Sequence, residues 1–241
     1  MRRLAGAIQF LTLIPMPSGA TVGESAVFFP IVGALVGALA SGVYLLLDRI
    51  LPFAISSLGA LLFLVAITGG LHEDGLADAA DALRSGRSPE KILAIMKDSR
   101  IGAYGGVALL FSILIRWQTL AALGASSTVA LIISEALPRT AFVALSRIST
   151  PIGDGLGAAL NSGLTRNAML LTVSQGAAIA AALAPRLAPA LLLGSAAIVW
   201  CARFYFHRRI GGITGDCLGA TGQIVECFCL LAFVVAKGDR A

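Results

Sequence analysis

Four carboxylates gather in one short stretch of a chain that otherwise carries few charges. Glu73, Asp74, Asp78 and Asp81 lie within GGLHEDGLADAADAL, directly after a long run without charge. The glycine pair at residues 69–70 is expected to end the preceding apolar span, and a helix is expected to resume around Glu73. At about 100° per residue, this helix would place the three aspartates on a stripe roughly 60° wide, with Glu73 beside the stripe and His72 pointing away from it. Because like charges at this spacing repel one another, a positive partner must offset them.

An acidic run is commonly a helix face exposed to water, but three features argue against that interpretation here. Small and apolar residues alternate with the acids, and no Lys or Arg lies between Glu73 and Arg84. Gly75 is also unfavourable inside a helix, so we expect a ligand or another backbone to approach it closely. In hydrocarbon, each ionised acid would cost about 2.5–3.5 kcal/mol. We therefore expect a wet cavity or a bound cation.

Magnesium is the cation that this pattern favours. Mg²⁺ binds carboxylate oxygens and commonly bridges them to substrate phosphates, and two such ions can hold both the attacking and the leaving oxygen of a displacement. The pattern predicts phosphoryl transfer, with Asp74, Asp78 and Asp81 as metal ligands, and with Glu73 as either a further, outer ligand or a plain surface acid. One of the aspartates, such as Asp81, could also accept a proton. The choice of base and the number of ions stay open.

The composition indicates that these acids belong to a membrane protein. Of 241 residues, 57% are hydrophobic and 13% are charged, whereas soluble domains carry about 25% charged residues. We predict an all-α polytopic membrane helix bundle of about seven transmembrane helices, forming a single domain over residues 1–241. The expected spans are residues 25–47, 50–71, 104–123, 128–146, 167–184, 187–202 and 218–236. Few aromatic residues and no alternating strands argue against a barrel.

The net charge of +5 is interpreted as topology, and not as affinity for nucleic acid. Loops on the cytoplasmic side are enriched in Lys and Arg, and placing the N-terminus inside puts most basic residues there. Arg49, Arg186, Lys237 and Arg240 then fall outside. The acidic helix faces the cytoplasm in this arrangement. We expect the first twenty residues to lie as an amphipathic segment at the inner interface, because Gln9 interrupts the apolar run that a signal peptide needs.

Three segments together resemble a known family. Residues 69–81 closely resemble the acidic signature of the cobalamin synthase family of bacterial membranes. Residues 95–105, IMKDSRIGAYG, look like its I-M-K-D-S-R-x-G-x-[FY]-G segment, and residues 214–220, TGDCLGA, look like its T-G-D-x-L-G-A segment. The matches follow the family's order and cover the chain. Family members often carry an aliphatic residue where Glu73 stands, and Ile213 replaces a common Tyr.

The resemblance implies an adenosylcobinamide-GDP ribazoletransferase of the bacterial inner membrane. Such an enzyme joins adenosylcobinamide-GDP to α-ribazole, or to its 5′-phosphate, and releases GMP with the help of Mg²⁺ during assembly of the cobalamin nucleotide loop. The acid pattern is also similar to that of the CDP-alcohol phosphotransferases, although their usual arginine is here Asp78. The alternatives are another enzyme of that kind or a cation-coupled transporter. A membrane prenyltransferase would normally carry two Asp-rich clusters.

The other motif residues receive roles from the same resemblance. Lys97 and Arg100 would neutralise phosphoryl charge, where anchoring of a cytoplasmic loop is the plainer explanation and suffices for Arg84, Arg87 and Lys91. Asp98, Gly102 and Gly105 would lie near a phosphate at a helix start. Asp216 would serve the site, within a glycine-rich run that could equally be a helix-packing face. His207, Arg208 and Arg209 would attract guanosine phosphates or merely set topology.

Two further charged groups are expected inside the bundle. Glu135 and Arg139 are one helical turn apart and are expected to pair, although a catalytic role is an equal alternative. Arg116 is expected to pair or to extend to the membrane surface. The expected partners of the protein are the small-molecule substrates and membrane lipid. A homo-oligomer is compatible with the sequence, which does not determine the oligomeric state.

Overall fold

A computed structural model describes residues 1–17, 19–83, 88–98 and 100–238. The predictions made for Arg84, Arg87 and Arg240, and position 99 of the second motif, lie outside these residues. The helices are α1 (Arg2–Leu11), α2 (Val22–Ser25), the 3-10 helix η1 (Ala26–Phe28), α3 (Phe29–Leu47), α4 (Phe53–Thr68), α5 (Leu71–Leu83), α6 (Pro89–Met96), α7 (Ala103–Leu123), the 3-10 helix η2 (Gly124–Ser126), α8 (Ser127–Ile148), α9 (Leu156–Asn161), α10 (Arg166–Leu183), α11 (Ala188–Ile210) and α12 (Gly215–Gly238).

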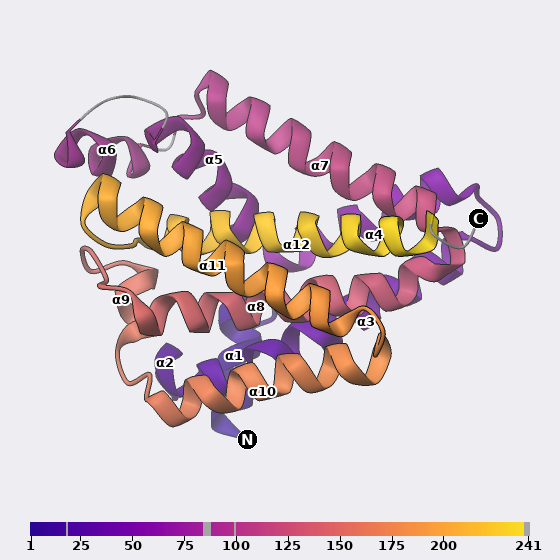
Figure 1. The fold of residues 1–241 in the computed structure, drawn as a ribbon, viewed down its shortest axis with the longest axis horizontal. Coiled ribbons are helices and arrows are strands. Elements are labelled where there is room, and N and C mark those ends of the chain that lie inside the picture. Colours follow the sequence, from indigo (N-terminus) through magenta and orange to yellow (C-terminus); the bar gives the residue numbers. More distant parts are fainter. Residues whose placement is uncertain (18, 84–87, 99, 239–241) are drawn as a thin grey trace.

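The long helices lie side by side in a bundle, and the short helices α5, α6 and α9 gather at one end of it, on the left in Figure 1. The described C-terminal end of α12 lies at the opposite end of the bundle. Each predicted span overlaps one of the long helices. The all-α fold class of a membrane-type helix bundle is therefore confirmed.

The bundle also contains a set of candidate membrane spans. In the described part of the chain, four helical segments are long and apolar enough to cross a membrane: Val22–Leu47, Ala103–Ile148, Ala188–Ile210 and Gly215–Gly238. The bent pair α4 and α5 would make a fifth. As one straight helix, the 46-residue segment would be about 69 Å long at 1.5 Å per residue, more than twice the hydrocarbon thickness of about 30 Å. It consists instead of α7 and α8, which run in opposite directions (Figure 1). The predicted total of seven stays a prediction.

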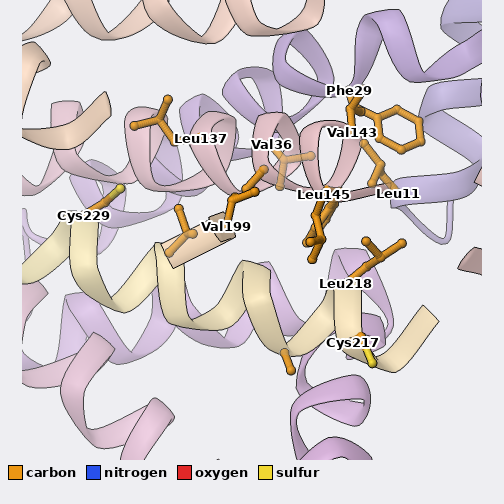
Figure 2. Packing of buried hydrophobic residues seen from close by; sticks show 14 of the residues in the cluster. Leu11, Phe29, Val36, Leu137, Val143, Leu145, Val199, Cys217, Leu218 and Cys229 are labelled. Carbon is orange, nitrogen blue, oxygen red and sulfur yellow. The ribbon is translucent and has the colours of Figure 1, made fainter. Parts of the chain in front are cut away.

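Small residues bring the central helices together. A Cβ added to Gly33 or Gly37 of α3 would overlap the backbone carbonyl oxygen of Glu135 or Leu131, respectively, both in α8. This spacing of small residues is the one that lets membrane helices approach closely. Figure 2 shows the apolar core that results, with side chains from α1, α3, α8, α11 and α12. Its labelled members are Leu11, Phe29, Val36, Leu137, Val143, Leu145, Val199, Cys217, Leu218 and Cys229.

The outer surface of the bundle is apolar as well. Leu62, Leu110 and Leu193 are among many large hydrophobic side chains that are more than half exposed. A soluble protein rarely exposes so many large apolar side chains, whereas lipid contact would bury them. The exposed surface thus agrees with the composition in indicating a membrane protein.

A break between α4 and α5 creates the end of the bundle where the acids lie. Gly69 and Gly70 both have positive φ angles, of 68° and 69°, a conformation that glycine adopts without strain. The Gly70 amide donates to the Val65 carbonyl at 3.0 Å, and the axes of α4 and α5 differ by 86°. The prediction that this glycine pair ends the second span is confirmed. The acidic helix begins at Leu71, two residues before the expected start.

Candidate active site

Asp74 and Asp78 face the same groove at the polar end of the bundle. The groove has a volume of about 640 Å³ and lies between the end of α1, the α4–α5 turn and the start of α7. Phe10 and Ile101 are among its other lining residues. Asp74 is exposed and Asp78 is half-buried. Neither carboxylate has a hydrogen bond or an ion pair to another residue that the structure describes, so both are open to a ligand.

Asp78 has several other carboxylates around it. Because α5 turns away from α4 across the end of the bundle, this side chain lies outside the span that α4 makes. Partial burial, and then the nearby negative charge of Asp74, Asp216, Asp81 and Asp98, raises the pKa of Asp78 to about 6. Repulsion of this kind is what a bound cation or a hydrogen-bond donor would relieve.

Asp216 approaches the same site from α12. A Cβ at Gly75 would lie 3.1 Å from the Cα atom of Asp216 and 3.2 Å from that of Gly219. The expected close approach at Gly75 is therefore made by another backbone. Asp74 and Asp216 both line a second, smaller cavity of about 110 Å³. Thr214 donates its hydroxyl to the Asp216 carboxylate at 3.2 Å.

Asp81 faces the N-terminus of α7 and does not line the groove. Its Oδ2 accepts the backbone amide of Gly102 at 2.7 Å, and its Oδ1 accepts that of Gly105 at 2.9 Å. A Cβ at either glycine would overlap this carboxylate. The phosphate expected at these two amides is thus replaced by an internal carboxylate, which satisfies a helix N-terminus in the same way. The role of Asp81 as ligand or base stays a prediction.

Glu73 lies beside the aspartate stripe on α5, as expected, and its side chain points into the bundle. Its Oε1 accepts a hydrogen bond from Nη1 of Arg116 at 2.7 Å, inside the bundle. Nε of Arg116 lies 2.7 Å from Oε1 of Glu226 on α12, and Arg116 is only 1% exposed. Burial of a guanidinium demands close carboxylates, which explains why Glu73 points inward. Its position does not support the predicted metal contact.

The basic residues predicted to contact phosphate differ in their exposure and in their partners. Arg100, with its side chain 87% exposed, pairs with Asp98 at 2.6 Å. Lys97 and Arg208 are exposed. Arg209 donates to the carbonyl of Leu83, the last residue of α5, at 3.0 Å. The structure thus brings Asp98, Arg100 and Arg209 to the polar end near α5, while a phosphate contact by any of them stays a prediction.

The expected pair within α8 is present. Glu135 and Arg139 form an ion pair of 2.7 Å one turn apart, and both side chains are almost fully buried. Arg116 pairs with Glu73 and Glu226, which is the first of the two arrangements expected for it. The sequence analysis missed Gln223 and Glu226, which contact the Glu73–Arg116 pair from α12. A polar residue and an acid within an otherwise apolar run were the signal that could have identified them.

His72 was expected to point away from the acids, and it lies against α8. Its ring stacks on that of Phe142 with centroids 4.9 Å apart, and Nδ1 lies 3.5 Å from Nη2 of Arg139. This histidine therefore extends the buried polar cluster and packs the acidic helix onto the bundle.

The donor set at the groove is suitable for Mg²⁺ bound together with a phosphate. Among the described residues, no group of three or more His, Cys, Asp or Glu side chains is arranged to hold a metal. Mg²⁺, however, is usually held by one or two carboxylates, with water and substrate phosphates completing its shell. Asp74 and Asp78 offer two such carboxylates on one groove.

Comparison with known proteins identifies relatives along nearly the whole chain. Residues 3–234 match the model of the family described as Cobalamin-5-phosphate synthase. A protein of Ralstonia pickettii named adenosylcobinamide-GDP ribazoletransferase is 38% identical, over 93% of this chain and 91% of its own length. A protein of the same name from Shewanella piezotolerans is 35% identical, over 95% of this chain and 93% of its own length. Another, from Geotalea daltonii, is also 35% identical, over 96% of each chain. No solved structure matches.

Proposed function

Because the chain belongs to the Cobalamin-5-phosphate synthase family, we propose that it is an adenosylcobinamide-GDP ribazoletransferase that acts with Mg²⁺. One observation supports this most strongly. The three motif segments are far apart in sequence, yet they meet at α5, where Gly75 contacts the backbone of Asp216 and Asp81 accepts the amides of Gly102 and Gly105.

The proposed reaction exchanges the anhydride bond of a diphosphate for a new phosphate ester bond. The ribose 3′-hydroxyl of α-ribazole, or of its 5′-phosphate, attacks the phosphorus on the cobinamide side of the diphosphate. A new P–O bond forms, the bridging P–O bond breaks, and GMP leaves with its electron pair. The hydroxyl proton passes to a carboxylate of the site. The chain must therefore hold a diphosphate beside a ribose and keep both aligned.

Asp74 and Asp78 are the residues that would hold Mg²⁺, which when bound supplies positive charge to the diphosphate. The open groove next to them is large enough for an extended phosphate substrate. Asp216, on the other side of Asp74, would orient a ribose hydroxyl by accepting its hydrogen bond. Arg100 and Lys97 lie in the second motif at the rim and would neutralise phosphate charge after Arg100 exchanges Asp98 for substrate.

The rival interpretation as a cation-coupled transporter has no support. It predicted carboxylates in the middle of the membrane that could carry a cation. The bundle core does contain Glu73, Glu135 and Glu226, but each of them pairs with Arg116 or Arg139.

The test is product formation by the full-length protein in detergent. With Mg²⁺ and adenosylcobinamide-GDP, we expect GMP release only when α-ribazole or its 5′-phosphate is added, and we expect EDTA to stop it. Binding of adenosylcobinamide-GDP without release of GMP under these conditions would refute the proposed activity. Release of GMP that persists in EDTA would refute the role of Mg²⁺ but not the proposed activity.

A further inference from the structure

Two anchors hold the acidic helix, and both belong to α7. Near the start of α5, Glu73 accepts a hydrogen bond from Arg116, which lies in the middle of α7. Near the end of α5, Asp81 accepts the amides of Gly102 and Gly105 at the beginning of α7. The anchored residues are eight positions apart, which is about 12 Å along the helix and about 80° around it. Two anchors on different faces prevent α5 from rotating as well as from sliding.

The Arg116 anchor is rigid because it is buried. The exposed fractions of the Arg116 and Glu73 side chains are 2% and 11%. Gln223 accepts a second hydrogen bond from Nη1 at 3.2 Å, and Glu226 pairs with Nε. Removing one partner of such a pair leaves an uncompensated charge in the core. Glu73 therefore has one low-energy position, and the adjacent residue, Asp74, is fixed with it.

The Asp81 anchor uses a carboxylate as the cap of another helix. Amides at a helix N-terminus have no partner within the helix, and a negative charge there is stabilised by the helix dipole. Both carboxylate oxygens are used, so the side chain holds a fixed orientation. Between the two anchors lie Asp74 and Asp78, the carboxylates that face the groove without a partner among the described residues.

We propose that Asp81 is a positioning residue and not a metal ligand: together with Glu73 it clamps α5 to α7 and so directs Asp74 and Asp78 into the groove. This inference rests on the proposed function, because it names the residues that position the metal-binding pair. It revises the expectation that all three aspartates share one role.

The decisive comparison is Asp81→Asn against Asp78→Asn, two identical changes one turn apart on α5. Asparagine can still accept an amide hydrogen bond at a helix N-terminus, but it is a poor ligand for a hard cation. We measure the affinity for Mn²⁺ by electron paramagnetic resonance, together with kcat and KM, below the melting temperature of every variant. Asp81→Asn should keep its Mn²⁺ Kd within about threefold and kcat within about tenfold, the equivalent of one lost hydrogen bond. Asp78→Asn should weaken Mn²⁺ binding by more than about tenfold, as expected for a lost ligand.

Asp81→Ala separates positioning from plain stability. It removes both amide contacts, so kcat should fall well below that of Asp81→Asn, even at temperatures where the variant remains folded. Partial rescue by asparagine is the signature of a cap, since a lost ligand would not be rescued. Equal weakening of Mn²⁺ binding by Asp81→Asn and Asp78→Asn would overturn the proposal. So would a wild-type protein that binds no Mn²⁺, or an Asp81→Ala protein with wild-type kcat.

Glu73→Gln and Glu226→Gln form a matched pair for the other anchor. Each change removes one negatively charged partner of Arg116, but only Glu73 belongs to the acidic helix. Both should lower the melting temperature, and only Glu73→Gln should lower kcat, by about tenfold for a displaced catalytic group. Equal effects on kcat would refute the Glu73 anchor. A wild-type protein that releases no GMP would refute the proposed function instead, while the Mn²⁺ comparison would still decide the inference.

Discussion

The aspartates of α5 have the same chemistry, and their surroundings make them different. Asp78 is half-buried among other carboxylates and has no described partner, whereas both oxygens of Asp81 accept backbone amides. A carboxylate without a partner and next to other carboxylates is destabilised by charge repulsion unless a ligand offsets it. Binding of a cation is the use that the groove supports best.

Asp78→Asn tests this use at a single residue. The change keeps the size of the side chain and removes its charge, so we expect insertion into the membrane to be normal. The kcat for GMP release should fall by about 10²–10³-fold, the size of a lost electrostatic contact in a transition state. The matched control is Asp48→Asn, at the C-terminal cap of α3 and away from the acidic helix. This change should leave kcat unaltered. Wild-type turnover by Asp78→Asn would remove it from the site.

At the level of elements, the site depends on close contact between α5 and α12. Gly75 and Gly219 face each other, and a Cβ at either would lie 3.2 Å from the Cα of the other. This contact brings Asp74 of α5 near Asp216 of α12, so that both residues line the smaller cavity. Helix packing and the geometry of the site are therefore coupled at one pair of glycines.

The pair Gly75→Ala and Gly42→Ala tests that coupling. Both glycines lie within helices, where alanine is better by up to about 1 kcal/mol. A Cβ at Gly42 meets nothing within 4 Å, so this change should leave the melting temperature unchanged or raise it. A Cβ at Gly75 would press on the Asp216 backbone, and overpacking costs about 1–3 kcal/mol. We expect Gly75→Ala to lower both the melting temperature and kcat.

The two variants are compared in the same detergent by thermal unfolding and by GMP release. Identical behaviour of both would show that the α5–α12 contact yields without consequence. The site would then not depend on this pair of glycines.

For the molecule as a whole, the proposed reaction must take place at one end of the bundle. The C-terminal ends of α5, α8 and α11 meet there: Arg203 of α11 donates to the carbonyl of Ile148, and Arg209 to that of Leu83. The same end holds most of the described basic side chains, a distribution typical of the cytoplasmic side. We propose that this end faces the cytoplasm, where nucleotide substrates are found.

Cysteine labelling tests the orientation in intact cells. In a variant without native cysteines, Arg186→Cys lies in the α10–α11 turn at the far end, and Lys91→Cys lies on α6 next to the site. A membrane-impermeant maleimide should label Arg186→Cys in whole cells and Lys91→Cys only after permeabilisation. The opposite pattern would place the site outside the cytoplasm and contradict the proposed orientation.

The sequence by itself determined what depends on neighbours along the chain. Long apolar runs predicted the helices, the glycine pair at residues 69–70 predicted the break after α4, and the one-turn spacing predicted the pair of Glu135 and Arg139. The three motifs led to the family that the comparison confirms. All of these features can be derived from local order, because helical geometry fixes which residues within a turn or two are neighbours.

Only the tertiary structure decided which partner each acid received. Glu73 meets Arg116 across 43 residues, and Asp81 meets Gly102 across 21. Helical spacing places Asp81 on the stripe and Glu73 beside it, but it describes α5 alone and identifies no partner for either acid. Their roles differ because α7 supplies a buried guanidinium at one point and free amides at another. Such contacts depend on how helices pack around a common core, which no local pattern specifies.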